Sequence, residues 1–234
     1  MTLVTEALDR AARQCSVTAP SSWITATDDE HVEVRDDFLM ETVDDILERV
    51  DLPSPIGAQT TIAGDGNATY ALPSDFKRLA RDKMAVYDIT LDRIVCPVTS
   101  DGEWSRLTDI GPSGERYYRL TGYDGNWSIT FEDAVPAGTS IVVSYVTTCW
   151  AINGTAKASL SDPDDVLLLP RRVVEAGIVW RWRERKGLPF QDKMMEYEAL
   201  IARLSNDTRG RRTINMGERR EVRWQDQIPN FIPS

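Results

Sequence analysis

Near the start of the chain, apolar residues recur every three or four positions, the spacing that places them on one face of a helix. Residues 2–15 carry one such face. After a loop with an acidic run, Asp36 or Asp37 is expected to open a second helix, which ends before Pro53. The pattern therefore predicts two amphipathic helices at this end of the chain.

From about residue 57 the period changes from 3.6 to 2, and short β-branched and aromatic runs alternate with turn residues. Asp101-Gly102 is expected to form one of these turns. The spacing favours a small antiparallel sandwich or barrel. The predicted strands are 59–63, 69–72, 83–90, 93–98, 115–120, 127–131 and 140–147.

The helical period returns at Asp162, which precedes a proline and two further aspartates and so has the features of an N-cap. This helix, interrupted at Pro170, is expected to run to Lys186, with Gly187 in place to cap its end. A last helix is predicted over about 190–205.

The order of elements predicts an α+β fold in which helices from both ends of the chain form a four-helix-type bundle. An antiparallel β sandwich or barrel is inserted between the two halves of this bundle. The predicted parts are the N-terminal helices (1–56), the β module (57–158), the C-terminal helices (159–206) and an extended tail (207–234).

A net charge of −10 disfavours the phosphate contacts that supply most nucleic-acid affinity. A dedicated DNA-binding domain is therefore not expected. No stretch reaches the roughly 18 apolar residues of a membrane span, and the first residues lack the pattern of a signal peptide. We expect a soluble protein made in the cytoplasm, without membrane contact.

The sequence offers little material for catalysis. His31 is the only histidine and is expected to be exposed in an acidic loop, and no serine stands in a GxSxG elbow. The three cysteines form no CxxC pair, so neither a zinc site nor a disulfide framework is indicated. We predict no catalytic, metal-binding or cofactor-binding residues, and no enzymatic activity.

Charges are segregated along the chain. Residues 1–52 carry thirteen acidic side chains against four arginines, a net charge of −9, whereas residues 171–186 carry a net charge of +4. Two explanations stay open. Either the two blocks neutralise each other within one molecule, or they meet between identical subunits in a heterologous contact that can close into a ring.

The tail combines arginines with large apolar residues, types that are enriched as anchors of protein interfaces. We therefore expect this segment to bind a partner, either a neighbouring subunit or another protein of an assembly. The predicted contact residues are Arg211, Arg212, Arg219, Arg220, Arg223, Trp224, Ile228 and Phe231.

The order of the predicted elements resembles that of the head-to-tail adaptor (connector, head-completion) proteins of tailed bacteriophages. The opening LVTEALDRAARQCSV is similar to the first helix of that family, and Tyr70 to Leu79 is similar to the run that starts its β region. Further similar stretches are Tyr118 to Gly122, Ile129 to Tyr145 and Leu169 to Arg181. The resemblance covers roughly residues 2–206.

The resemblance implies a virion neck protein that forms a ring, commonly of twelve subunits, docked on the portal protein around the DNA channel. DNA would pass through without specific binding, and downstream tail or neck proteins would assemble on the ring. The alternative is a carbohydrate- or receptor-binding tail or fibre module that stacks aromatic side chains on its ligand. Its candidate aromatic residues are Trp104, Tyr117, Tyr118, Tyr123 and Trp127.

Overall fold

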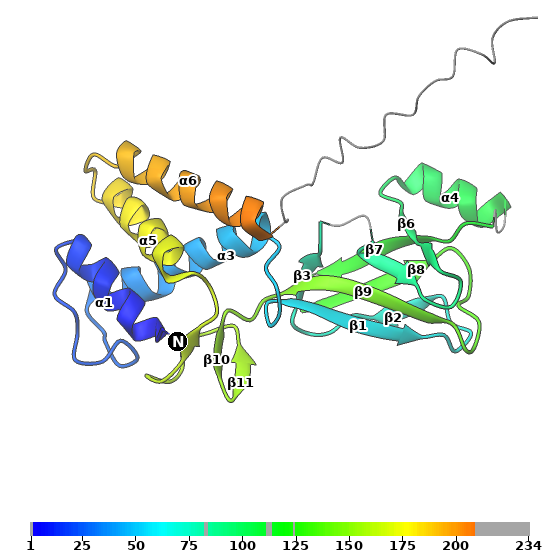
Figure 1. Ribbon diagram of the computed structural model, residues 1–234, viewed down its shortest axis with the longest axis horizontal. Helices are drawn as coiled ribbons and strands as arrows, with labels where there is room; N and C mark the ends of the chain where they lie inside the picture. The colour runs from blue at the N-terminus through cyan, green and yellow to red at the C-terminus, as the bar shows by residue number, and fades with distance from the viewer. Residues whose placement is uncertain (1, 82–83, 111–113, 124, 209–234) are drawn as a thin grey trace, which may run out of the picture.

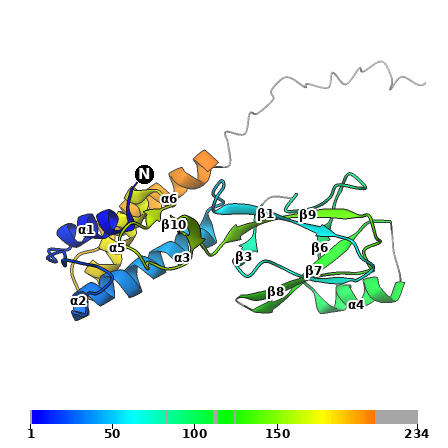
Figure 2. The same cartoon turned by 90° about the horizontal axis from the view of Figure 1, so that it is seen from below.

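A computed structural model describes residues 2–81, 84–110, 114–123 and 125–208. Figure 1 shows two lobes side by side, one built of helices from both ends of the chain and one built of β-strands. A view turned by 90° shows the same separation (Figure 2). The predicted α+β class is confirmed.

The helical lobe begins with α1 (Val4–Gln14), which buries Val4, Ala7, Leu8, Ala11 and Ala12 as its apolar stripe predicts. The next helical segment consists of α2 (Asp29–Val32), η1 (Glu33–Phe38) and α3 (Leu39–Arg49). It thus begins at Asp29, earlier than the predicted start at Asp36 or Asp37. The reason lies in η1, a π-helical turn that buries Val34 and Phe38 and so extends the apolar face backwards.

The predicted helix start at Asp162 is wrong. Residues Val166–Leu167 form a short strand, β12, which pairs with β10 (Ala151–Asn153). Asp165 is fully buried and accepts hydrogen bonds from the backbone N–H groups of Ser161 and Asp162 and from the Lys157 ammonium group. The acidic cluster therefore closes a turn in place of capping a helix.

The last two helices are α5 (Arg171–Arg185) and α6 (Gln191–Thr208). α5 begins directly after Pro170 and ends at Lys186, and Gly187 follows with a φ of +67°, as the sequence predicts for the cap. α5 packs against α1, α3 and α6 and contributes Val173, Val174, Ile178 and Val179 to the core of this lobe.

The β module contains two sheets that share one core. In the first sheet, β1 (Gly57–Ala63), β9 (Ser140–Thr147), β4 (Val86–Asp88) and β5 (Arg93–Ile94) follow in this order, and β3 (Phe76–Leu79) also pairs with β9. In the second sheet the order is β2 (Thr69–Ala71), β8 (Asn126–Phe131), β7 (Tyr117–Tyr123) and β6 (Cys96–Pro97). Within the described ranges neither sheet closes into a barrel.

Several details of the β module differ from the prediction. The predicted strands did not include β3, nor two short strands over residues 151–153 and 155–157. β6 pairs with β7 in parallel, whereas the other strand pairs are antiparallel. Asp101-Gly102, predicted as a turn, instead opens the helix α4 (Asp101–Ile110). This helix packs Trp104 and Leu107 against Val98 in a small core of its own. That packing stabilises the helix, and it cannot be predicted from the turn residues Asp101-Gly102 alone.

A third, small sheet lies at the junction of the lobes and combines β10 with β11 (Thr155–Lys157) and β12. The N-terminal end of α1 is attached to it, because Val4 N–H donates to the carbonyl oxygen of Asp165 over 2.9 Å. Trp150, which is almost completely buried, donates from Nε1 to the carbonyl oxygen of Ala158. The chain therefore passes from the sandwich into α5 through an ordered connection.

Candidate interaction surfaces

The two charged blocks meet inside the helical lobe. Arg185 of the basic block lies 3.8 Å from Asp37 of the acidic block. Lys186 lies 2.9 Å from Glu33. For these side chains, the structure shows neutralisation within one molecule.

Arg181 is the central cation of this contact. Its side chain is only 10% exposed, and its guanidinium lies 4.5 Å from the ring centroid of Trp180 and within 3.5 Å of Glu41 and Asp45. Tyr197 donates its hydroxyl hydrogen to Asp45 over 2.6 Å, and burial together with this hydrogen bond raises the pKa of Tyr197. A buried arginine stacked on an aromatic ring and paired with carboxylates fixes α5 against α3 and α6.

A separate polar contact joins the helical lobe to the β module. Arg78 of β3 donates from Nη1 to Asp51 Oδ1 over 2.6 Å, and from Nε and Nη2 to the carbonyl oxygens of Leu47 and Val50. Arg81 donates to the carbonyl oxygens of Glu48 and Arg49. Two arginines of the β module therefore cap the C-terminal end of α3, where carbonyl groups lack partners within the helix.

The histidine differs from its prediction. His31 lies in α2 instead of an exposed loop, its side chain is 13% exposed, and Nε2 lies 2.8 Å from the carbonyl oxygen of Thr18. Its ring packs edge-on against Trp23. His31 thus ties α2 to the preceding loop. Within the described ranges, no group of three or more histidine, cysteine, aspartate or glutamate side chains is placed to hold a metal ion.

The cysteines of the chain are all free thiols. Cys15 is buried, and burial raises the pKa of its thiol to about 12. Cys96 and Cys149 are half-buried. A raised pKa keeps the Cys15 thiol protonated and unreactive at neutral pH, so this residue contributes to the packing of the core.

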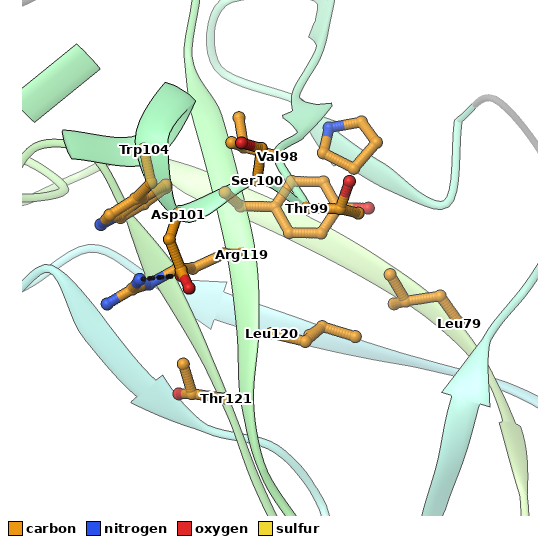
Figure 3. Close-up of a pocket in the computed structure, with 11 residues that line it drawn as sticks. Leu79, Val98, Thr99, Ser100, Asp101, Trp104, Arg119, Leu120 and Thr121 are labelled. Carbon is orange, nitrogen blue, oxygen red and sulfur yellow. Dashed lines mark ion pairs between the residues drawn. The ribbon is translucent and has the colours of Figure 1, made fainter. Parts of the chain in front are cut away.

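A cavity of about 410 Å³ lies between α4 and β7 (Figure 3). Trp104 and Arg119 form one wall, with the guanidinium 4.7 Å from the indole centroid, and Asp101 lies 3.7 Å from Arg119. The rest of the lining is mostly apolar or hydroxyl-bearing. It comprises Leu79, Pro97, Val98, Thr99, Ser100, Tyr118, Leu120 and Thr121.

The aromatic residues of the β module are mostly not available for stacking on a ligand. Trp104 and Tyr118 are buried, and Tyr117 and Trp127 are half-buried. Tyr123 is 69% exposed. Since a sugar platform needs several aromatic faces open on one side, their burial removes the main support for a carbohydrate-binding site.

Two surfaces of the first sheet are open. The turn between β4 and β5 carries Ile89 and Leu91, which are 54% and 51% exposed, and Ile94 on β5 is 42% exposed. On the opposite edge of the sheet, β1 pairs with β9 and with no other strand of the described residues. Exposed apolar side chains and an unpaired strand edge are both features of surfaces that contact other protein chains.

The contact residues predicted in the tail, from Arg211 to Phe231, lie outside the described residues. The surfaces found on the sandwich were missed by the sequence analysis. Alternation of polar and apolar residues identifies a strand but not its place at the edge of a sheet, and it does not reveal which turn is left uncovered.

None of the helices in the described part of the chain combines the length and apolar character that crossing a bilayer requires. The described parts offer an ion-paired helical lobe and a β sandwich with open surfaces, an arrangement suited to contacts with other proteins. The family model of the SU10 adaptor protein matches residues 2–225. The chain belongs to this family of phage head-to-tail adaptors and is therefore a structural adaptor of a bacteriophage virion. No curated protein matches the chain.

Proposed function

We propose that the protein forms a ring of twelve copies that docks on the portal protein, surrounds the DNA channel and carries the next components of the neck or tail. The observation that carries this proposal is the family match, which spans both lobes and extends into the tail. Because the match covers almost the whole chain and not one module of it, it supports assigning the role of the family to this protein.

A ring needs a heterologous contact, in which two different surfaces of each subunit meet. The sandwich offers two open surfaces for contacts of this kind, the β4–β5 turn and the β1 edge, which lie on opposite sides of one sheet. The helical lobe is less suited to it because several of its charged side chains already pair internally.

A role as a DNA conduit agrees with the charge of the chain. At a net charge of −10, a ring of this protein would repel phosphate on average and let a duplex slide without specific binding. We propose that residues 1–56 and 159–206 act as one helical bundle, residues 57–158 as an inserted module and residues 207–234 as a docking segment. The docking segment would contact the portal protein or a neighbouring subunit through its arginines and aromatic anchors.

The test is electron microscopy of the purified full chain mixed with isolated portal, or with portal-bearing capsids, of its phage. We expect a ring of added density on the portal. Absence of this density while the portal is intact would contradict the proposal. Glycan binding by the chain under those conditions would favour the carbohydrate-binding alternative instead.

A further inference from the structure

The hydrogen-bond register shows which backbone groups of β1 remain open. Thr147 N–H donates to the carbonyl oxygen of Ile56, and Gly64 N–H donates to the carbonyl oxygen of Thr139. In an antiparallel pair the residues that bond across the ladder alternate with residues that face away from it. The backbone groups of Gln59, Thr61 and Ala63 therefore point away from β9, and no described residue binds them.

Among the described residues, this edge lacks the usual protection against strand pairing. Proteins cover an open edge or break it with proline, a charged side chain or a bulge. β1 reads GAQTTIA and pairs with β9 in an unbroken register over its whole length. Its seven residues also make it one of the longer strands of the module, since β4 and β5 on the opposite side have three and two.

The two faces of the sheet at this edge differ in polarity. Ile62 is buried and Ala58 packs against the sandwich core, whereas Gln59, Thr61 and Ala63 are exposed on the outer face. On that outer face Gln59 donates a hydrogen bond to Ser144 Oγ of the neighbouring strand. A strand added here would therefore need one apolar face and one polar face.

The tail contains a segment with this alternation. In residues 222–228, Val222, Trp224 and Ile228 occupy alternate positions, and Arg223, Gln225 and Gln227 stand between them. Asp226 is the one polar residue in the apolar series. The segment has seven residues, as β1 does, and Pro229 follows it, a residue that cannot donate to a ladder.

The tail also starts in a suitable place. Both views show α6 ending on the side of the helical lobe that faces the β module (Figures 1 and 2). Thirteen residues, 209–221, separate the end of α6 from the alternating segment. A fully extended chain of this length spans about 45 Å.

From these observations we infer that the open edge of β1 binds residues 222–228 of a neighbouring copy as an added strand. The inference rests on the proposed ring, because one edge and one tail segment per subunit make a heterologous contact that can repeat around a closed circle. Backbone hydrogen bonds to Gln59, Thr61 and Ala63 supply the affinity, and the apolar side chains extend the sandwich core beside Ala58 and Ile62.

The first experiment compares the full-length variants Thr61→Pro and Thr61→Val on isolated portal by electron microscopy. Proline removes the outward N–H of position 61 without touching the β1–β9 ladder, and valine keeps this N–H. We expect loss of the ring with Thr61→Pro and an unchanged ring with Thr61→Val. A ring with Thr61→Pro like that of the wild type would overturn the inference and leave the adaptor function intact. No ring even with the wild type would instead contradict the proposed portal-docked ring.

A second experiment covers the case in which Thr61→Pro does not fold. Copies carrying Thr61→Cys are mixed with copies carrying Gln225→Cys, assembled on portal and treated with a short bis-maleimide. The polar face of the tail segment would place position 225 near position 61, since diagonal neighbours across strands lie about 7 to 8 Å apart. We expect a cross-linked pair of chains joined at 61 and 225, and no such product from either variant alone, which controls for the native cysteines.

The remaining results of this cross-linking experiment would overturn the inference. A third sample, in which one chain carries both substitutions, tests the same contact within a chain. A 61–225 link within that chain, without a link between the two single variants, would show that the edge binds its own tail. A link from position 225 to the portal protein would show that the tail binds the portal. Absence of any link at position 225 in assembled rings would show that the tail does not bind the β1 edge.

Discussion

Arg78 and Asp51 form an ion pair at 2.6 Å that joins the β sandwich to the end of α3. The same arginine binds the carbonyl oxygens of Leu47 and Val50, and Asp51 also accepts from the backbone N–H of Arg81 over 3.0 Å. The orientation of the sandwich relative to the helices is therefore fixed at one helix end.

Replacement of Arg78 by alanine should destabilise the protein by about 3 kcal/mol, because Asp51 and the helix carbonyl groups lose a partly buried cation. Lys77→Ala is the matched control, since Lys77 pairs with an Asp44 side chain that is 61% exposed. That pair should contribute less than about 1 kcal/mol. Urea unfolding of the two variants measures both losses, and equal losses would show that Arg78 is not the main junction contact.

Much of the fold follows from the sequence because its signals are local. The 3.6-residue period identified α1 and α6, and the period of two identified β1, β8 and β9. The predicted elements were wrong where residues typical of a local motif make tertiary contacts instead. The Asp162 cluster has the residues of a helix cap, but the structure uses Asp165 as a buried acceptor beside β12.

The interaction surfaces could be predicted less well than the elements. The π-helical turn η1 depends on packing of Phe38 into the core of the helical lobe, and α4 depends on packing of Trp104 against Val98. No short pattern encodes either contact. The open edge of β1 depends on the strand order of the whole sheet. The charge segregation was visible in the sequence, but only the structure shows that Lys186 and Arg181 pair with acidic side chains of the same molecule.

Gly177 of α5 is expected to tolerate no side chain. A Cβ atom there would lie 2.2 Å from Thr42 Cγ2 and 2.8 Å from Thr42 Oγ1. Gly177→Ala should therefore cost about 2 kcal/mol through overpacking, more than the roughly 1 kcal/mol that alanine contributes to helix stability. Thermal and urea unfolding measure the net effect.

Thr42→Ser provides the control for this prediction. It removes the methyl group nearest to position 177 and keeps the hydroxyl that accepts a hydrogen bond from Arg181. The double variant Gly177→Ala, Thr42→Ser should recover part of the lost stability. Full additivity of the two single effects would contradict a steric contact between these residues.

Asp165→Asn should reduce stability by about 2 kcal/mol at neutral pH, because the charged acceptor of three hydrogen bonds is lost. Burial opposes ionisation of this carboxyl, but the hydrogen bonds from Lys157, Ser161 and Asp162 outweigh it and lower the pKa of Asp165. Because the pKa of Asp165 is lower in the folded state, its ionisation stabilises the fold at any pH above about 4, the pKa of an aspartate in the unfolded chain. This contribution is lost as the pH falls through the pKa of Asp165 in the folded state. Urea unfolding at pH 7 and below pH 4 should show the difference between wild type and variant shrinking in acid, whereas a constant difference would exclude the charge as its cause.

Deletion of residues 208–234, which removes only the last residue of α6 from the described fold, should abolish docking on the portal while the rest of that fold stays intact. The segment holds the predicted anchors Trp224, Ile228 and Phe231, and it lies beyond the packed core of α6, whose buried residues are Tyr197 and Ile201. Circular dichroism and thermal unfolding should therefore match the full chain, and electron microscopy with portal should show no ring. A full-length chain with all three anchors replaced by serine separates their contribution from that of the tail arginines, because it keeps every positive charge. If this variant docks like the wild type, the arginines alone hold the tail, and if the deleted chain docks, the tail is not the docking segment.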